Sequence, residues 1–250
     1  MRGYEGFVFD IDGTAVPDGA LSVESAFTKE VFAALPSNIY AIAATGRTAD
    51  FALPITSQLT LSHDAVISNG AQVMNSNNGN VYWQELLSEN QVVEILQRYK
   101  VYNYQLCVAG DPMDCNKTAA QQEARASAGV FLLNMPQELA QQALADIIDM
   151  DNIYAYISEG WHDEQQVYDV NIGQANARKD IALKRLFGKY AIDASKMVAI
   201  GDGVNDIDVF TTVGYRIAVA NAHPRLLELA DEIVPSQEDD GLASVVQRFL

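Results

Sequence analysis

Residues 6–14 read GFVFDIDGT, an apolar run that ends in two aspartates, a glycine and a threonine. A short apolar run of this kind is typical of a buried β-strand. If the strand geometry continues past Phe9, Asp10 and Asp12 point to the same side, because side chains alternate with period two. Two carboxylates this close repel unless a cation lies between them or one holds a proton. The stretch predicts a buried strand followed by a reactive carboxylate pair or by a simple acidic turn.

Both ways of relieving the repulsion are chemically useful. A hard cation such as Mg²⁺ takes oxygen ligands and commonly accompanies phosphate. A carboxylate can also attack phosphorus, while a second one protonates the leaving group and then activates water. Gly13 permits a sharp turn, and Thr14 can donate to phosphate. A calcium-binding EF-hand loop is excluded, because the positions that need Gly and Glu hold Ala15 and Leu21.

Strands that end in polar residues recur along the chain. Residues 39–44 form an apolar run before Thr45-Gly46-Arg47, residues 65–68 come before Asn69-Gly70, and residues 197–200 come before GDGVND. Further strands are predicted at 216–219 and 233–234. Helical patterns are predicted over 23–35 (with Ser22 as N-cap and Pro36 at the end), 179–187, 206–212, 224–230 and 242–249. Strands that alternate with helices predict an α/β fold with a doubly wound parallel sheet.

The middle third of the chain has a different character. Glutamine is frequent there, and the apolar residues of 153–157 and 167–172 alternate, which is typical of an antiparallel sheet with one wet face. Helices are predicted at 88–100 and 136–149, and Asn78-Gly79 indicates a hairpin over 72–83. We therefore expect a catalytic core formed by residues 1–83 and 173–250, with an inserted α+β domain at 84–172.

Four polar signatures lie at strand ends, namely FDIDGT, ATGR, SNG and GDGVND. In a doubly wound sheet, ligands bind beyond the carboxyl ends of the strands, so these signatures predict one site. Asp202 and Asp206 can offer carboxylates to a cation, and Asn205 lies between them. A dinucleotide-binding fingerprint is disfavoured, because Asp206 stands where Gly or Ala is needed. Lys179 begins a predicted helix, where it is either a solvated lysine or the partner of an anion.

Composition narrows the class of protein. The 250 residues are 49% hydrophobic and 20% charged, which predicts a full core in one large domain or in a larger and a smaller one. The net charge of −17 and the pI of about 4.3 disfavour nucleic acid and anionic membranes as partners. A phosphorylated substrate would need local cations. Cys107 and Cys115 fit no metal or redox spacing, so we expect both to be reduced. No signal peptide or membrane span is evident, so we expect a cytoplasmic protein. Nothing in the sequence demands more than a monomer.

Together the four motifs resemble those of the haloacid dehalogenase superfamily of phosphatases, in particular its Cof-type branch with the sucrose-phosphate phosphatases (subfamily IIB). The resemblance covers nearly the whole chain and includes the tail AVANAHPRLLELADEIV. It implies a HAD-like core with a cap and a Mg²⁺-dependent phosphatase that forms an aspartyl phosphate. The favoured substrate is a small phosphorylated metabolite, in particular a sugar phosphate. One departure is Lys179-Asp180, where the family usually has lysine-glycine.

The resemblance also implies roles for individual residues. Asp10 is the expected nucleophile and Asp12 the general acid and base, which offers its backbone carbonyl to the metal. The catalytic set is Asp10, Asp12, Thr45 and Lys179. The metal set is Asp10, Asp12, Asp202 and Asp206. The phosphate and substrate set is Thr14, Thr45, Gly46, Arg47, Asn69, Gly70, Lys179 and Asn205.

Two alternatives to a phosphatase remain open from the sequence. One is a phosphomutase of the same branch, which would move phosphate within a hexose. The other is a binding module without catalysis, which the intact Asp10 and Asp12 disfavour. The inserted domain is expected to close over the site and to select the substrate, with Arg125, Trp161 and His162 as candidate contacts or as ordinary surface.

Overall fold

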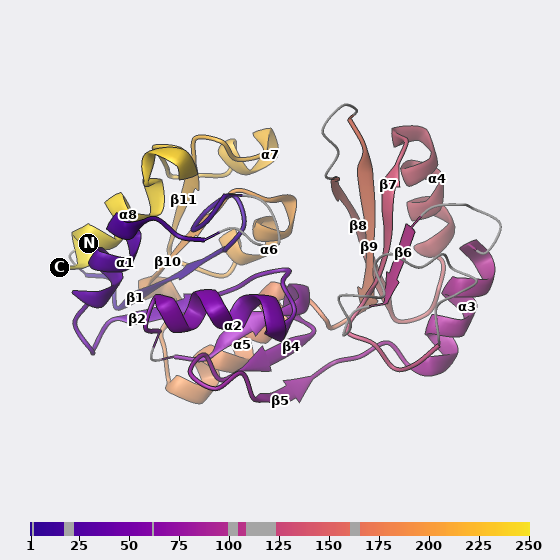
Figure 1. The fold of residues 1–250 in the computed structure, drawn as a ribbon, viewed down its shortest axis with the longest axis horizontal. Coiled ribbons are helices and arrows are strands. Elements are labelled where there is room, and N and C mark those ends of the chain that lie inside the picture. The colour runs from indigo at the N-terminus through magenta and orange to yellow at the C-terminus, as the bar shows by residue number, and fades with distance from the viewer. Residues whose placement is uncertain (2, 18–22, 62, 100–104, 109–123, 161–165) are drawn as a thin grey trace. The chain divides into compact units, whose positions relative to one another are not determined.

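The computed structural model describes residues 1, 3–17, 23–61, 63–99, 105–108, 124–160 and 166–250 (Figure 1). These residues form two compact units. The first consists of Met1–Trp83 and Lys179–Leu250, and the second of Gln84–Arg178. The first therefore collects the segments that carry all four motifs. Each unit has its own hydrophobic core.

A five-stranded parallel sheet, ordered β12-β11-β10-β1-β2, forms the centre of the first unit. Its strands are β1 (Gly6–Phe9), β2 (Tyr40–Ala43), β10 (Met197–Gly201), β11 (Tyr215–Val219) and β12 (Glu232–Val234). All four residues of β1 are buried, as expected for a central strand whose sheet is covered on both faces. Phe9 pairs with Ile200 on one side and with Ala43 on the other, so three strands end level with one another.

A smaller sheet extends this unit beyond β2. Its strands, in order, are β3 (Ala65–Ile67), β4 (Gln72–Met74) and β5 (Val81–Gln84). A parallel bridge between Ala44 and Val66 connects β3 to the end of β2. The hairpin predicted at 72–83 is confirmed. In its turn, the Gly79 amide donates to the Asn75 carbonyl at 2.9 Å, and Gly79 has a φ of +72°, which favours glycine.

Helices follow most strands of the first unit. They are α1 (Ala26–Ala33), α2 (Ala49–Gln58), α5 (Lys179–Tyr190), α6 (Ile207–Phe210), α7 (Pro224–Leu227) and α8 (Gly241–Val246). In Figure 1, α1 lies beside α8, and these two helices are in contact. The doubly wound parallel architecture predicted from the sequence is confirmed.

Two helices differ from the sequence prediction. The N-cap of α1 is Ser25, whose hydroxyl accepts the Thr28 amide at 3.0 Å; the predicted cap, Ser22, lies outside the described residues. Helix α2 was not predicted, and it contains Pro54. Proline lacks an amide hydrogen and is disfavoured in a helix interior, so the local signal argued against this helix. Its buried residues Ala52 and Ile55 pack in the core and supply the compensation.

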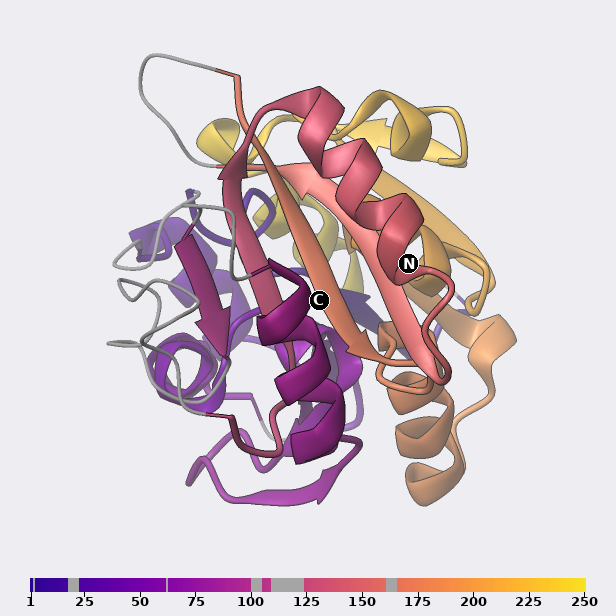
Figure 2. The same ribbon diagram turned by 90° about the vertical axis from the view of Figure 1, so that its right-hand side faces the viewer.

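The second unit is a four-stranded antiparallel sheet with two helices. The strands, ordered β6-β7-β9-β8, are β6 (Gln105–Val108), β7 (Val130–Met135), β8 (Ile153–Glu159) and β9 (Tyr168–Gln174). Helices α3 (Glu89–Tyr99) and α4 (Gln137–Ile147) cover one face, which Figures 1 and 2 show from two directions. Val170 and Ile172 of β9 pack with them, so Asp169 and Asn171 belong to the opposite face. This confirms the α+β character expected for the insert.

Strands β6 and β7 were not predicted. In β7 the pairing with β9 is irregular between Leu132 and Met135, and Asn134 has a φ of +58°. Such a bulge breaks the two-residue alternation that identifies a strand in a sequence. The predictions for Cys115, Trp161 and His162 lie outside the described residues, as does that for the side chain of Cys107. Among the helices of the described residues, none combines the length and the apolar character that crossing a membrane requires.

Asp169 gives the second unit a testable pH dependence. Burial raises the pKa of Asp169 from 3.8 to about 6, although the Asn134 amide, which donates to it at 2.8 Å, acts in the opposite direction. The folded state therefore binds this proton more tightly than the unfolded state, and the free energy of unfolding falls as the pH rises through this window. Asp169→Asn removes the effect, so we expect the variant to be about 1–2 kcal/mol more stable than the parent at pH 7.

Urea denaturation followed by circular dichroism at pH 4 and pH 7 measures this difference. The exposed Asp149→Asn serves as the control and should follow the parent at both pH values. An unchanged dependence on pH in the Asp169 variant would contradict the assignment.

Candidate active site

The level strand ends bring the sequence motifs to one edge of the sheet. The backbone pairing continues one residue past β1, since the Asp10 amide donates to the Ile200 carbonyl at 3.1 Å and the Ala44 amide to the Phe9 carbonyl at 2.8 Å. Asp10 therefore follows the central strand directly, between the loop after β10 and the loop after β2. This geometry is the structural reason why motifs far apart in the sequence meet.

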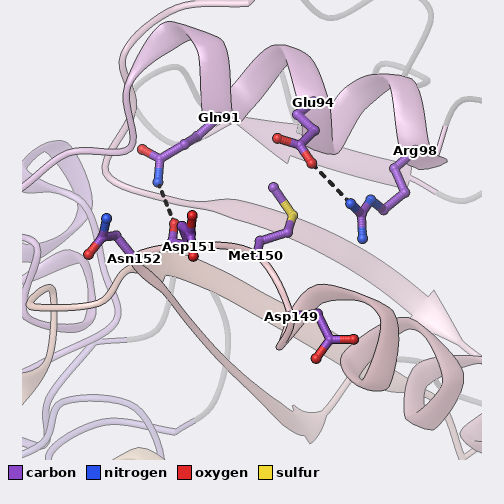
Figure 3. A pocket seen from close by; sticks show the side chains of 7 residues that line it. All are labelled: Gln91, Glu94, Arg98, Asp149, Met150, Asp151 and Asn152. Atoms are coloured by element: carbon purple, nitrogen blue, oxygen red, sulfur yellow. Dashed lines mark hydrogen bonds and ion pairs between the residues drawn. The ribbon is translucent and has the colours of Figure 1, made fainter.

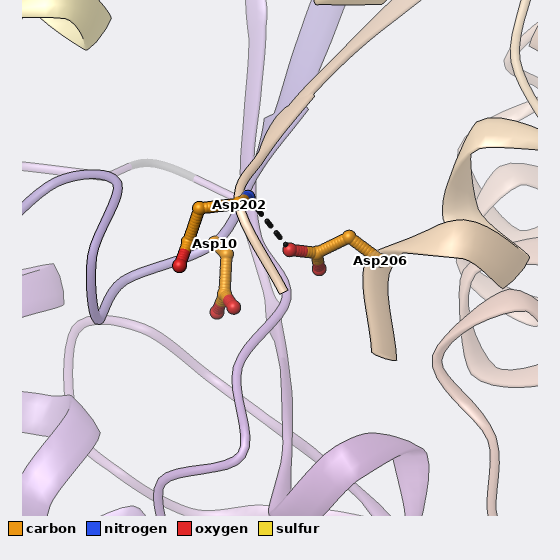
Figure 4. A group of neighbouring side chains, drawn as sticks. All are labelled: Asp10, Asp202 and Asp206. Atoms are coloured by element: carbon orange, nitrogen blue, oxygen red, sulfur yellow. Dashed lines mark hydrogen bonds between the residues drawn. The ribbon is translucent and has the colours of Figure 1, made fainter. Parts of the chain in front are cut away.

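Three carboxylates gather at this edge. Asp10, Asp202 and Asp206 each offer one oxygen, and these three atoms lie within 4.8 Å of one another (Figure 4). Asp10 and Asp206 are buried, and Asp202 is half-buried. Buried carboxylates require compensation by positive charge or by hydrogen bonds. Clustered hard oxygen donors are also the ligands that Mg²⁺ prefers, so the residues present fit a divalent cation.

Lys179 supplies part of the compensation. It is the first residue of α5 and is only 2% exposed. Its Nζ lies 3.1 Å from Oδ2 of Asp10 and 2.7 Å from Oδ1 of Asp206. The alternative of a solvated lysine is therefore wrong. The two carboxylates also offset the unfavourable interaction between a lysine and the N-terminal end of a helix dipole.

The charges of Asp10, Asp206 and Lys179 shift one another's pKa values. Burial raises the pKa of Asp10 well above its ordinary value, and Asp206 raises it further, while Lys179 acts in the opposite direction. Burial alone would lower the pKa of Lys179, but Asp10 and Asp206 raise it by more, and its net pKa lies above the ordinary value. Lys179 thus keeps its positive charge beside Asp10 throughout the neutral range.

Asp206 shapes the loop after β10. Its Oδ2 accepts the amides of Asp202 at 3.1 Å and Gly203 at 3.0 Å, while its Oδ1 faces Lys179. Both oxygens thus have nitrogen donors, and these contacts fix the loop that carries Asp202. At Gly201 an added Cβ would lie 2.5 Å from Oδ2 of Asp206, so the loop can close only over glycine.

The turn after Asp10 approaches Asp202 very closely. Gly13 has a φ of +68°, and a Cβ there would lie 2.3 Å from Oδ2 of Asp202. The hydroxyl of Thr14 donates to Oδ1 of Asp202 at 2.6 Å. Thr14 was predicted as a phosphate contact; in this structure its hydroxyl holds Asp202, a candidate metal ligand.

Asp12 points toward Arg47 and is not one of the three clustered carboxylates. Nε and Nη2 of Arg47 donate to the two carboxylate oxygens at 2.8 and 2.6 Å, which makes a bidentate pair. The Asp12 side chain is 34% exposed, and that of Arg47 only 7%. Arg47 was predicted as a phosphate contact; in this structure its guanidinium pairs with Asp12 and orients that carboxylate.

The loops after β2 and β3 meet beside this pair. Thr45 is fully buried, and its hydroxyl accepts the Arg47 amide at 3.1 Å. The Asn69 amide donates to the Thr45 carbonyl at 3.0 Å. Ser68, Asn69 and Gly70 all have positive φ values, of 51°, 55° and 96°.

Side chains also connect these loops to the one after β10. Nδ2 of Asn205 donates to Oδ1 of Asn69 at 2.9 Å, and a Cβ on Gly46 would lie 3.1 Å from that same oxygen. Gly46, Asn69 and Asn205 therefore lie together, as the motif reading expects.

One contact of the site was missed in the sequence. Asn221 follows β11 and donates from Nδ2 to the Gly13 carbonyl at 2.8 Å. The residue belongs to the quoted tail AVANAHP, but nothing in its local pattern distinguishes a contact to Gly13 from an ordinary loop asparagine. The contact spans 208 positions of the chain, so only the fold reveals it.

A separate cavity of about 410 Å³ lies in the second unit (Figure 3). It is lined by Gln91, Glu94, Arg98, Asp149, Met150, Asp151 and Asn152. Figure 3 shows the Arg98 guanidinium turned toward Glu94, and the two are 2.9 Å apart. The cavity is lined entirely by residues of this unit, whereas all the clustered carboxylates belong to the other one.

The sequence profile of the haloacid dehalogenase-like hydrolases matches residues 7–246. This chain belongs to that family. The resemblance drawn from the four motifs is thereby confirmed, and the chain is identified as a hydrolase. The profile spans both structural units, so the second unit is part of the family pattern.

Individual relatives agree with this assignment. A phosphoglycolate phosphatase of Methanothermobacter thermautotrophicus is 34% identical over 89 residues, which are 34% of this chain and 40% of the relative. A 5-amino-6-(5-phospho-D-ribitylamino)uracil phosphatase of Bacillus subtilis is 23% identical over 96% of this chain and 94% of its own. The chain thus covers less than half of the first relative and nearly all of the second.

Solved structures share the fold. A haloacid dehalogenase-like hydrolase from B. subtilis superposes with a TM-score of 0.79 at 17% identity, covering 98% of this chain and all of the other. A subclass IIB sugar phosphatase superposes with a TM-score of 0.77 at 15% identity, covering 98% of both chains.

The close approach at Gly13 can be tested by substitution. Gly13→Ala places a Cβ against Asp202 and forces an L-residue into the left-handed region, so we expect a loss of stability of at least about 1–2 kcal/mol. Gly188→Ala is the matched control, because it lies in α5 with no atom within 4 Å of its added Cβ. There we expect a gain of about 0.5–1 kcal/mol. Chemical denaturation measures both, and equal effects would contradict the geometry.

Proposed function

We propose that this hydrolase is a Mg²⁺-dependent phosphatase that cleaves a small phosphorylated metabolite, in particular a sugar phosphate, through an aspartyl-phosphate intermediate. The observation that carries the proposal is the buried Lys179, which contacts the carboxylates of Asp10 and Asp206 beside Asp202. Phosphoryl transfer depends mainly on positioning and on neutralising negative charge. The ammonium group of Lys179, held beside the carboxylate of Asp10, can both position the phosphoryl group and neutralise its negative charge.

In the first step, Asp10 is the nucleophile and Asp12 is the general acid. A carboxylate oxygen of Asp10 attacks phosphorus, the bond from phosphorus to the ester oxygen breaks, and the leaving oxygen takes a proton from the Asp12 carboxyl. Asp10 is held for this attack by the Ile11 amide, which donates to its Oδ1 at 2.7 Å, and by Lys179 at Oδ2. Lys179 can also contact the phosphoryl oxygens.

The second step restores the enzyme. Water attacks the phosphorus of the aspartyl phosphate while the Asp12 carboxylate takes its proton, and the bond from phosphorus to Asp10 breaks to release inorganic phosphate. The guanidinium of Arg47 donates a hydrogen bond to each oxygen of Asp12, and these two contacts fix the plane of that carboxylate. In this proposal Asp12 takes part in the proton transfer of both steps.

The metal set in this proposal is Asp10 and Asp202 with the backbone carbonyl of Asp12, and Asp206 supports it through the loop amides. Mg²⁺ supplies positive charge that neutralises the carboxylates and the phosphoryl oxygens. Such compensation is needed in a chain with a net charge of −17, which otherwise repels a phosphorylated substrate. The proposed phosphate contacts remain Thr14, Thr45, Gly46, Arg47, Asn69, Gly70, Lys179 and Asn205.

We further propose that the first unit is the catalytic core and that the second is a cap that selects the substrate. The second unit is inserted in the chain between β5 and α5, and it contains Arg125 among the candidate substrate contacts. The relatives named above support a small phosphate monoester, since they are named as a phosphoglycolate phosphatase, a phosphatase of a phosphoribitylamino compound and a sugar phosphatase. In these compounds the leaving group is an alcohol, which needs a proton from an acid.

Release of inorganic phosphate tests the function directly. The panel contains hexose, pentose and sucrose phosphates, phosphoglycolate and flavin mononucleotide, each with Mg²⁺ and with EDTA. We expect metal-dependent release that Asp10→Asn abolishes, because the variant lacks the nucleophile. Folded parent protein that releases no phosphate from any substrate would contradict the proposal. Conversion of mannose or glucose phosphates without net release would indicate the phosphomutase instead.

The role of Asp12 predicts a dependence on the leaving group. We compare kcat/KM for p-nitrophenyl phosphate, whose leaving group needs little protonation, with that for the best alkyl phosphate of the panel. Asp12→Asn should lower kcat/KM for the alkyl phosphate by about 10²–10⁴ and that for the aryl phosphate far less. Asp231→Asn is the control, since it breaks a similar bidentate pair with Arg216 at 2.8 and 2.7 Å outside the site. Equal losses on both substrates would exclude the acid role.

A further inference from the structure

The loop that follows β11 contacts both halves of the candidate metal site. Nδ2 of Asn221 donates to the Gly13 carbonyl at 2.8 Å, and the His223 amide donates to the Asp202 carbonyl at 2.8 Å. Gly13 belongs to the turn that follows Asp10, whereas Asp202 belongs to the loop after β10. Residues 221–223 therefore connect two ligand-bearing segments that are far apart in the sequence.

The orientation of the Asn221 amide is determined by its two partners. The Gln237 amide donates to Oδ1 of Asn221 at 2.8 Å, so the oxygen must face Gln237 and the NH₂ group must face the Gly13 carbonyl. Gln237 begins a short 3₁₀ turn that leads into α8. The Asn221 side chain thus hydrogen-bonds to the backbone on both sides. It thereby holds the Gly13 turn at a fixed position relative to Gln237.

The position of the turn matters because its clearance from Asp202 is minimal. Thr14 donates to Oδ1 of Asp202 at 2.6 Å. The backbone of Gly13 lies so close to Oδ2 of Asp202 that a Cβ at this position would collide with it. A small displacement of the turn therefore changes how Asp202 and Asp10 face each other. Cation affinity depends on such distances, since ligands must reach the ion together.

We propose that Asn221 is a positioning residue for the divalent-cation site. It holds the turn that carries Asp10 and Asp12 at a fixed distance from Asp202, without being a ligand itself. The inference rests on the cation dependence proposed above. It assigns a role to Asn221, a residue to which the four sequence motifs assign none. Outer partners of this kind typically change metal affinity by about 10–100-fold when they are removed.

Cation binding without substrate tests the proposal. Isothermal titration with Mg²⁺, and Mn²⁺ titration followed by electron paramagnetic resonance, give Kd for the parent, Asn221→Ala and Asn221→Leu. Both substitutions leave the charge unchanged, and leucine keeps the branched shape of the side chain, so an effect common to both variants reports the lost hydrogen bonds. We expect Kd to rise by about 10–100-fold in both variants. Phosphatase kcat should return close to the parent value once Mg²⁺ is raised to saturation.

Asn78→Ala is the matched control. Its side chain also holds a backbone turn, accepting the Asn80 amide at 3.0 Å, but in the hairpin of the small sheet. Its Kd should equal that of the parent. Melting in EDTA compares the stability of the folded proteins before any cation is added.

The outcomes separate this proposal from the proposed function. A lower melting temperature in EDTA with unchanged Kd in the Asn221 variants would show a purely structural role and overturn the positioning role alone. A loss of kcat that saturating Mg²⁺ does not restore would also overturn it. If the parent binds neither cation, the cation dependence of the hydrolase fails, and this inference fails with it.

Discussion

The site depends on the burial of two carboxylates beside one lysine. Asp10 and Asp206 are both almost fully shielded from water, and Lys179 lies against each of them. A buried charge that loses its partner is strongly destabilising, so the three residues hold one another in place. Because Lys179 is the first residue of α5, this charge balance exists only when α5 begins at the carboxyl edge of the sheet. The ion pairs thus couple the docking of a helix to the chemistry of the site.

A second constraint is the closeness of the loops at that edge. Gly13 and Gly201 face carboxylate oxygens at distances that leave no room for a side chain. At Gly13 the backbone of one motif therefore lies directly against the acid of another, Asp202. Thr14 and Asn221 then add hydrogen bonds between these loops, and Asp206 adds hydrogen bonds within the loop after β10. The neutral side chains of Thr14 and Asn221 place ligands accurately without adding charge, and this accuracy is what a small, strongly solvated cation requires.

Much of the fold could be predicted from local pattern. The buried runs at β1, β2 and β10 are fully apolar, and each ends in a polar motif. These two features together predicted the parallel sheet and the position of the site at its carboxyl edge. The pattern failed where a local rule was broken by tertiary packing. Helix α2 tolerates Pro54 because its apolar residues pack in the core, and β7 contains a bulge that hides its alternation. The N-cap of α1 is Ser25, which stands three residues from the serine that was predicted.

By itself, the sequence determined the residue types and the order of the strand ends, because strand periodicity and turn residues act over a few positions. The resemblance of its four motifs to the haloacid dehalogenase-like hydrolases, which the matching profile confirms, indicated the family and the acids of the site. The tertiary structure alone decided the partners. It turned Asp12 toward Arg47, brought both oxygens of Asp206 to nitrogen donors, and placed Asn221 against Gly13. These contacts join loops separated by up to 208 positions, and they arise from the level ends of parallel strands. No local pattern encodes such a distance, since only the packing of the sheet determines which loops become neighbours.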